Sequence, residues 1–285
     1  MSGSPRIAIV TDSSADLPAE ILRQKGITVV PLNVHFGEEV YRDQVDITTE
    51  TFMERLTHSA VLPKTSQPSP AAFEAIYSEL AESYDGILSI HISAKLSGTV
   101  QSALLARTHL EGRVPVEVVD SKNASLGLGL QALRAAELAA SGLSLSAIAA
   151  QLREETDRYH LIFFVDTLEY LQRGGRIGRA AALAGSILRL KPVLRIEEGQ
   201  VVPHERTRTR ARALATIEQF IRSMPRIERL AIVHSSSPDD AKRLAESLAP
   251  LTPNEAPLVA TLGPAIATHS GPGAIGIVAY EGART

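Results

Sequence analysis

Hydroxyl-bearing side chains gather in five short segments of the chain. The segments are Thr11-Asp12-Ser13-Ser14, Thr65-Ser66-Gln67-Pro68-Ser69, Ser93-Ala94-Lys95-Leu96-Ser97-Gly98-Thr99, Asp120-Ser121 and His269-Ser270-Gly271-Pro272-Gly273. Hydroxyls, together with the free N–H groups at the start of a helix, can bind an oxygen-rich group such as a carboxylate. For each single segment the alternative is helix capping, which needs no ligand. Three segments begin where a buried strand is expected to end, and such loops converge at one edge of an α/β sheet. This favours one shared polar site.

Two glycine patterns match parts of a dinucleotide-binding fingerprint but lack its context. Gly271 to Gly276 reads G-x-G-x-x-G, yet only nine residues follow it and they are predicted to form a strand, not a helix. Gly127-Leu128-Gly129 with Ala132 precedes a predicted helix, but the preceding strand ends seven positions earlier. No phosphate loop, zinc-binding helix or nucleophile elbow occurs. We therefore expect no nucleotide cofactor at these patterns.

Composition excludes several other classes of protein. The 285 residues include no Cys and no Trp, and the eight His residues form no i, i+4 pair, so thiol chemistry is excluded and no metal site is expected. A net charge of −3 argues against a nucleic-acid-binding protein. No apolar stretch approaches the roughly 18 residues of a membrane span. We expect a cytoplasmic enzyme or ligand-binding protein with an aliphatic core and no stable membrane insertion.

The N-terminal part alternates between strand-like and helix-like patterns. Strands are predicted at Ile7–Val10, Ile27–Val34, Glu38–Arg42, Ile87–Ile92 and Val116–Val119. Helices are predicted from Asp16, as N-cap, to Gly26, from Thr48 or Thr49 to Leu56, and at Ala71–Ser83, Gly98–His109, Leu126–Ala140 and Leu145–Arg158, with Leu62–Pro70 as a Pro-rich loop. Short apolar strands separated by helices indicate a mostly parallel sheet.

The rhythm changes after about residue 160. A strand at Leu161–Val165 and a hairpin of Lys191–Ile196 with Gln200–Pro203 are followed by helices at Arg210–Ser223 and Pro238–Leu248 and strands at Leu230–His234, Leu258–Leu262 and Ile275–Tyr280. This pattern predicts a mixed sheet. We expect two α/β domains, residues 1–160 and 161–285, with a ligand in the cleft between them.

Seven blocks of sequence resemble the DegV family of bacterial fatty-acid-binding proteins, and they occur in the family's order along the whole chain. The blocks are Val10-Thr11-Asp12-Ser13-Ser14-Ala15-Asp16-Leu17-Pro18, Lys64-Thr65-Ser66-Gln67-Pro68-Ser69, Leu96-Ser97-Gly98-Thr99, Val119-Asp120-Ser121, Tyr170-Leu171-Gln172-Arg173-Gly174-Gly175-Arg176-Ile177, Leu190-Lys191-Pro192-Val193-Leu194 and His269-Ser270-Gly271-Pro272-Gly273. The resemblance implies one long-chain fatty acid, such as palmitate, stearate or oleate, held between two domains. Its carboxyl group would be bound by Thr65 and Ser97, with His269 close by.

The resemblance also implies a partner. Characterised members of the family are the binding subunit of a fatty acid kinase, which phosphorylates the carboxyl group for phospholipid synthesis. The chain would then be a carrier and not an enzyme. Further residues expected in the site loops are Ser13, Ser66, Gly98, Ser121 and Arg173. Arg206, Arg208 and Arg210 form a basic cluster that is either a solvated face or a docking patch for the kinase.

Two other functions stay open on the residues alone. A serine hydrolase would use Ser97 as nucleophile, His269 as base and Asp12 or Asp120 to orient the His, although the nucleophile elbow is absent. A transcriptional or signalling protein would use the basic segment that ends at Arg212, although the overall charge of −3 does not favour nucleic-acid contact.

Overall fold

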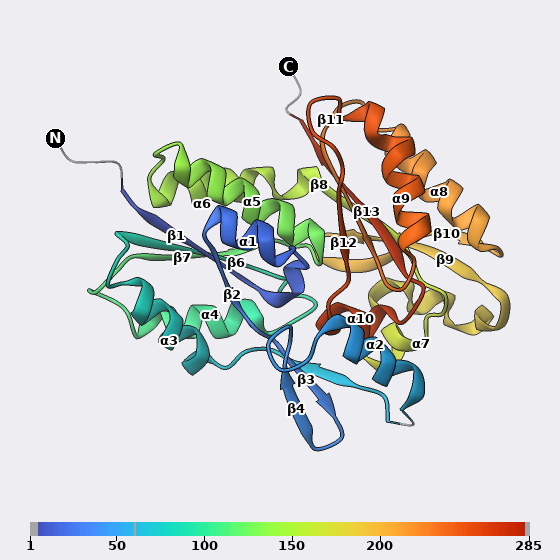
Figure 1. Cartoon of the computed structure of the whole chain (residues 1–285), viewed down its shortest axis with the longest axis horizontal. Coiled ribbons are helices and arrows are strands. Elements are labelled where there is room, and N and C mark those ends of the chain that lie inside the picture. Colours follow the sequence, from blue (N-terminus) through green and yellow to red (C-terminus); the bar gives the residue numbers. More distant parts are fainter. Residues whose placement is uncertain (1–4, 60, 283–285) are drawn as a thin grey trace.

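The chain folds around two sheets that follow one another in the sequence (Figure 1). The computed structural model describes residues 5–59 and 61–282, with the backbone only for 184–189. Sheet A contains β1 (Ile7–Asp12), β2 (Ile27–Val30), β6 (Gly86–His91) and β7 (Val116–Asp120), all parallel, in the order β2-β1-β6-β7. Helices α3 (Pro70–Leu80) and α4 (Thr99–Thr108) cover one face, and α5 (Leu126–Ala140) and α6 (Leu145–Glu155) cover the other. Helix α1 (Ala19–Lys25) lies beside β2.

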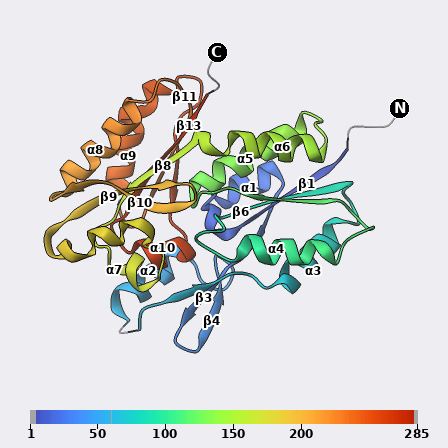
Figure 2. The same ribbon diagram turned by 180° about the vertical axis from the view of Figure 1, so that it is seen from behind.

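Sheet D is mixed and has six strands. It contains β8 (Tyr159–Phe164), β9 (Lys191–Glu197), β10 (Gln200–Thr207), β11 (Ile227–His234), β12 (Leu258–Thr261) and β13 (Ile275–Glu281), in the order β10-β9-β8-β13-β11-β12. Only the β11–β12 pair is parallel. Helices α8 (Arg210–Arg222) and α9 (Pro238–Leu248) pack on the face of sheet D that points away from sheet A. Figure 2 shows the same arrangement from the opposite side of the molecule.

Helix α5 joins the two sheets. It contacts β1 and β6 of sheet A on one side and β8, β11 and β13 of sheet D on the other. A helix enclosed in this way must be apolar around most of its circumference, and eleven of its fifteen residues are buried. Gly129 lets helix α5 pack closely on the turn that follows β1, because a Cβ at this position would lie 2.7 Å from the Ala15 carbonyl oxygen. One apolar core therefore runs through both sheets.

A small third sheet carries residues of the site. Antiparallel strands β3 (Asn33–Phe36), β4 (Glu39–Arg42) and β5 (Lys64–Ser66) form it, next to α2 (Thr49–His58). Two short helices, α7 (Glu169–Arg173) and α10 (Pro264–Ser270), pack on each other, and α10 also contacts α2, β3 and β5. The 3₁₀ turns are η1 (Ser13–Ala15), η2 (Thr156–Arg158), η3 (Gly178–Arg189) and η4 (Ala249–Leu251).

The predicted fold class is confirmed, whereas several local predictions are wrong. The strand expected at Ile27–Val34 is two strands, β2 and β3, because Pro31 between them has no N–H for a ladder. The loop expected at Leu62–Pro70 contains β5, and the segment around His269 forms helix α10.

Asp16 does not cap α1. It takes a left-handed conformation (φ 52°) after η1, and Pro18 precedes the helix without a side-chain cap. The Asp16 carboxylate instead accepts hydrogen bonds from Ser125 Oγ (2.5 Å) and the Gly263 N–H (2.8 Å), both distant in sequence. Burial raises the pKa of this carboxyl well above its usual value. The predicted division into domains at residue 160 stays a prediction, and the ends 1–4 and 283–285 of the two predicted domains lie outside the described residues.

Candidate functional site

A cavity lies between the inner face of sheet D and the loops that follow β1 and β6. Its volume is about 100 Å³, counted as the space open to the centre of a water molecule, whereas one water needs roughly 10–15 Å³ on this measure. Strand alternation supplies its wall: Leu161 and Phe163 of β8 face the cavity, while Ile162 and Phe164 pack into the core on the opposite side. Most of the remaining wall is aliphatic, including Ile92, Leu171, Ile196, Val201, Val233 and Leu262.

Thr65 and His269 meet at the polar part of this cavity. Thr65 on β5 and His269 on α10 are 204 positions apart in the sequence, and Thr65 Oγ1 lies 2.7 Å from His269 Nε2. Burial and the nearby Arg176 charge lower the pKa of His269 to about 4, so the ring is neutral at pH 7. Its Nδ1 is buried without a hydrogen-bond partner. The backbone of Gly174 passes so close that a Cβ there would lie 2.1 Å from Nδ1.

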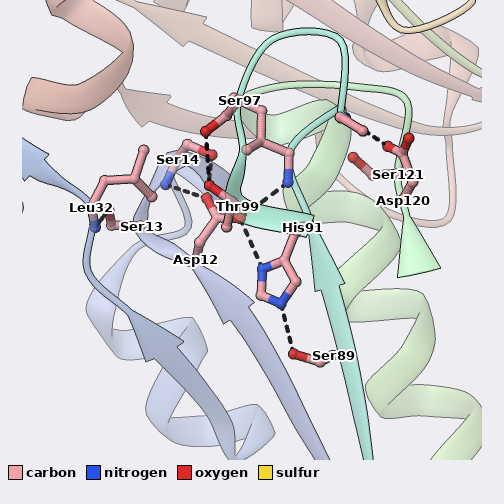
Figure 3. Close-up of polar contacts among 12 residues, drawn as sticks. Asp12, Ser13, Ser14, Leu32, Ser89, His91, Ser97, Thr99, Asp120 and Ser121 are labelled. Carbon is pink, nitrogen blue, oxygen red and sulfur yellow. Dashed lines mark hydrogen bonds and ion pairs between the residues drawn. The ribbon is translucent and has the colours of Figure 1, made fainter. Parts of the chain in front are cut away.

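Ser97 also lines the cavity, from the loop between β6 and α4. Its Oγ lies 2.8 Å from Thr99 Oγ1 (Figure 3). The Asp120 carboxylate holds the same loop by accepting a hydrogen bond from the Ala94 N–H (3.2 Å). Gly98 precedes α4 as its N-cap without a side-chain hydrogen bond. Ser97 therefore lies in a turn at the start of a ten-residue helix. The N–H groups and hydroxyls at such a helix start can bind an oxygen ligand.

Residues of the C-terminal part clamp this loop from the other side of the cavity. Ser93 Oγ donates to the Gly199 carbonyl oxygen (2.6 Å) in the β9–β10 turn. Arg176 Nε donates to the Leu96 carbonyl oxygen (3.0 Å). Gly199 has φ +79°, and a Cβ there would lie 2.4 Å from Ser93 Oγ. The position of the Ser97 loop thus depends on both sheets.

Among the residues whose side chains are described, Arg176 is the cation on the cavity wall. It lies beyond α7, lines the cavity, and donates from Nη1 to the Gly174 carbonyl oxygen (2.6 Å). Arg173, the arginine expected here from the sequence, is exposed and pairs with Glu169 (2.7 Å) on the surface. His269 is neutral at pH 7, so it adds no positive charge to that of Arg176.

A buried network supports another part of the wall, where Ser14 lines the cavity. Asp12 accepts hydrogen bonds from Ser14 through its backbone N–H (3.1 Å) and its hydroxyl, and from the Ile92 N–H (3.0 Å) and His91 Nδ1 (3.0 Å). Figure 3 shows Asp12 between Ser14 and His91. The network ties the turn after β1 to the end of β6.

The contacts do not form the triad that a serine hydrolase needs. Ser97 contacts Thr99, and His269 contacts Thr65. Asp12 faces His91, and Asp120 accepts from backbone N–H groups. His91 Nε2 does lie 2.6 Å from Ser89 Oγ, so Ser89, His91 and Asp12 form a chain of contacts in the sequence Ser–His–Asp. That group is fully buried and Tyr77 donates to its serine, so it has no room for a substrate.

Other loop residues named from the sequence lie outside the cavity wall. Ser13 Oγ accepts from the Leu32 N–H (3.0 Å), Ser66 Oγ contacts His35 (2.9 Å), and Ser121 Oγ contacts the Asn123 backbone. The Ser13 and Ser121 hydroxyls stabilise turns, and that of Ser66 links strands β5 and β3. The wall instead has polar residues that sequence reasoning missed, namely Ser14, Gln67, Ser125, Arg176 and Ser270. All of these residues except Ser125 belong to the seven sequence blocks described above, and that membership could have identified them as site residues.

The three arginines of the basic cluster differ in their surroundings. Arg210 donates to Asp240 Oδ2 (2.6 Å), Ser237 Oγ (2.7 Å) and the Gly273 carbonyl oxygen (2.8 Å), so it is part of the fold. Arg206 and Arg208 are exposed. Within residues 5–59 and 61–282 there is no cluster of acidic or His side chains suited to a metal ion, and no helix is long and apolar enough to cross a bilayer.

The protein therefore has a mixed α/β fold with a largely aliphatic cavity whose wall also carries polar side chains, which is typical of small-molecule sites. The family model described as "Uncharacterised protein, DegV family" matches residues 6–282. The chain belongs to the DegV family, which confirms the resemblance.

Known relatives are similar over nearly their whole length. A DegV domain-containing protein of Streptomyces coelicolor is 40% identical over 279 residues, covering 96% of this chain and 98% of the relative. The structure of a DegV family protein from Thermus thermophilus, described for its fatty acid binding, has 44% identity and a TM-score of 0.89, covering 97% and 99% of the two chains. DegV of Bacillus subtilis, described as a fatty acid binding protein, has 36% identity and a TM-score of 0.89, with 98% and 100% covered.

Proposed function

We propose that this protein binds one long-chain fatty acid in the cavity between its two sheets. The observation that carries the proposal is an aliphatic cavity whose polar part brings together Thr65, Ser97 and the Arg176 guanidinium. The two related structures from Thermus thermophilus and Bacillus subtilis, described as binding fatty acids, support it.

The tail supplies most of the affinity. Burial of about 15 methylenes at about 0.8 kcal/mol each gives roughly 12 kcal/mol before the costs of association. Each hydrogen bond to a carboxylate adds about 1.5–3 kcal/mol. The hydroxyls of Thr65 and Ser97 therefore fix the position of the carboxyl group, and Arg176 supplies the opposite charge that an ionised carboxylate requires when buried.

Thr65 can act as a relay in this arrangement. Neutral His269 with its proton on Nε2 donates to Thr65 Oγ1, which leaves the threonine proton free for the carboxylate. Burial and Arg176 hold the His269 pKa at about 4, so the ring acts in this role as a neutral hydrogen-bond donor and not as a cation.

Organic extraction and mass spectrometry of purified protein test the binding proposal. We expect a fatty acid of about 14–18 carbons, and delipidated protein should bind palmitate and oleate. Thr65→Val and Ser97→Ala should each weaken palmitate binding about tenfold or more through the lost hydrogen bond. Well-folded protein that holds no acid and binds neither probe would overturn the proposal.

We further propose that the protein is a carrier that presents the carboxyl group to a fatty acid kinase in the cytoplasm, which feeds phospholipid synthesis. Arg206 and Arg208 are the docking residues, since both are exposed and near the β10–α8 junction. Charges at the rim of an interface act mainly on the association rate and its salt dependence.

The partner proposal needs its own experiment. The double variant Arg206→Glu/Arg208→Glu should slow acyl phosphate formation by a purified bacterial fatty acid kinase with ATP, most strongly at low salt, while palmitate binding is retained. Arg23→Glu/Lys25→Glu, which reverses two charges on α1, is the matched control. Equal turnover of the Arg206/Arg208 variant and the control would remove these arginines from the docking surface.

A further inference from the structure

Ser270 is a buried hydroxyl on the cavity wall without a partner. It is the last residue of α10, its side chain is 7% exposed, and its Oγ makes no hydrogen bond. Native structures satisfy nearly all buried polar atoms, because an unpaired one costs folding free energy. A hydroxyl left free on the wall of a cavity is therefore available to a ligand.

The other hydroxyls on the described part of this wall already have partners. Ser14 donates to Asp12, and Ser125 donates to Asp16 (2.5 Å). Thr65 faces His269 and Ser97 faces Thr99, and both are assigned above to the carboxyl group. Ser270 is thus a polar group that the proposed carboxyl site does not use.

Chain geometry places Ser270 near the carboxyl end of a bound acid. It directly follows His269, whose ring contacts Thr65, and both residues line the cavity. The residues that follow it on the wall, Ala274 and Ile275, are apolar. An oxygen atom on one of the first carbons of the acyl chain would therefore meet Ser270 in otherwise apolar surroundings.

We propose that Ser270 recognises fatty acids that carry a hydroxyl group close to the carboxyl group, such as 3-hydroxy acids. A hydroxyl is donor and acceptor at once, so one substituent on the ligand can pair with Ser270 Oγ in either direction. An unsubstituted acid fills the same cavity and leaves Ser270 unpaired. A site that holds a buried polar group discriminates against the ligand that cannot pair with it. This inference rests on the proposed fatty acid binding.

Competition binding with three probes tests the inference. Delipidated protein is titrated with palmitate, 3-hydroxypalmitate and 16-hydroxypalmitate, and the ratio of affinities for 3-hydroxypalmitate and palmitate is compared between variants. Ser270→Ala should lower this ratio about three- to tenfold, and palmitate itself should bind as tightly or more tightly, because an unmatched polar group is gone. Ser270→Thr keeps the hydroxyl and should restore the ratio.

Ser121→Ala is the matched control. It removes a buried hydroxyl that lies outside the cavity wall and contacts the Asn123 backbone, so the ratio should stay as in the wild type. An unchanged ratio in Ser270→Ala overturns the inference. So does an equal loss for palmitate and 3-hydroxypalmitate, which would place Ser270 on the carboxyl group, or an equal response of 16-hydroxypalmitate. Wild-type protein that binds none of the probes would instead refute fatty acid binding itself.

Discussion

Alanine at position 174 should displace His269. Gly174 has φ −74° and ψ −8°, which any residue adopts. The added Cβ would lie 2.1 Å from His269 Nδ1 and 2.8 Å from Cε1. Ordinary contact is about 3.5 Å, so the ring must shift by about 1.4 Å. A shift of that size is incompatible with the 2.7 Å contact to Thr65 unless β5 moves as well.

The expected magnitudes follow from the two groups involved. Overpacking costs about 1–3 kcal/mol of stability. If Thr65 loses its fixed orientation toward the carboxylate, one charge-assisted hydrogen bond of about 1.5–3 kcal/mol is weakened, so palmitate affinity should fall about tenfold or more. Isothermal titration with palmitate measures the affinity, and the ring ¹⁵N shifts of His269 report the displacement directly.

Gly175→Ala is the control for this variant. Gly175 has φ +70° but no atom within 4 Å of its Cβ position, so alanine introduces strain of about 1–2 kcal/mol and no collision. Both variants should melt at lower temperature, but only Gly174→Ala should change the His269 shifts and weaken palmitate binding. Wild-type affinity in Gly174→Ala, or an equal loss in Gly175→Ala, would refute the role assigned to the Thr65–His269 contact.

Four further predictions concern the contacts that hold the Ser97 loop, the carboxyl groups of Asp43 and Asp46, and the ring of His269. Gly199→Ala collides with Ser93 and should weaken palmitate binding, whereas Gly112→Ala, with φ +80° and open space, should only lower the melting temperature. Burial raises the Asp43 pKa to about 7, so the free-energy cost of burying its ionised form grows as pH rises from about 4 to 7. The free energy of unfolding of Asp43→Asn, measured with urea, should therefore exceed that of the wild type by up to about 4 kcal/mol at pH 8 and by much less at pH 5. Arg42 lowers the Asp46 pKa to about 2, so Asp46→Asn should show the opposite sign, with stability lost above about pH 4. Carboxylate binding should raise the His269 pKa above about 4, which an NMR titration with and without palmitate measures.

The sequence predicted elements whose pattern is local. Apolar runs such as Ile87–Ile92 become central strands because both faces of sheet A are covered by helices, and β6 is buried along its whole length. Helix α5 was predicted with its observed ends, since fifteen residues of helix-forming sequence outweigh its two glycines. The strand order β2-β1-β6-β7 could not be predicted, because pairing is decided by tertiary packing.

The failures occur where distant residues decide the local conformation. Asp16 followed by Leu17 and Pro18 is a good signal for a helix start. Its carboxylate instead accepts hydrogen bonds from Ser125 and Gly263, which are 109 and 247 positions away in the sequence. Helix α10 has only seven residues, too few for a periodic pattern to emerge, although Pro264 and Gly271 mark its ends.

The polar part of the site depends on contacts between the N-terminal and C-terminal halves of the chain. Thr65 and Ser97 come from the N-terminal half, and His269 and Arg176 come from the C-terminal half. The contacts of Ser93 with Gly199 and of Leu96 with Arg176 cross the same boundary. A ligand that binds only the conformation in which these contacts are formed stabilises that conformation by RT ln(1 + [L]/Kd). This is about 2.7 kcal/mol when the free ligand concentration is a hundred times Kd. Loss of the acid should therefore loosen the Ser97 loop first, because contacts across the boundary hold it. Under the proposed function, binding of the acid would therefore be coupled to the order of the Ser97 loop.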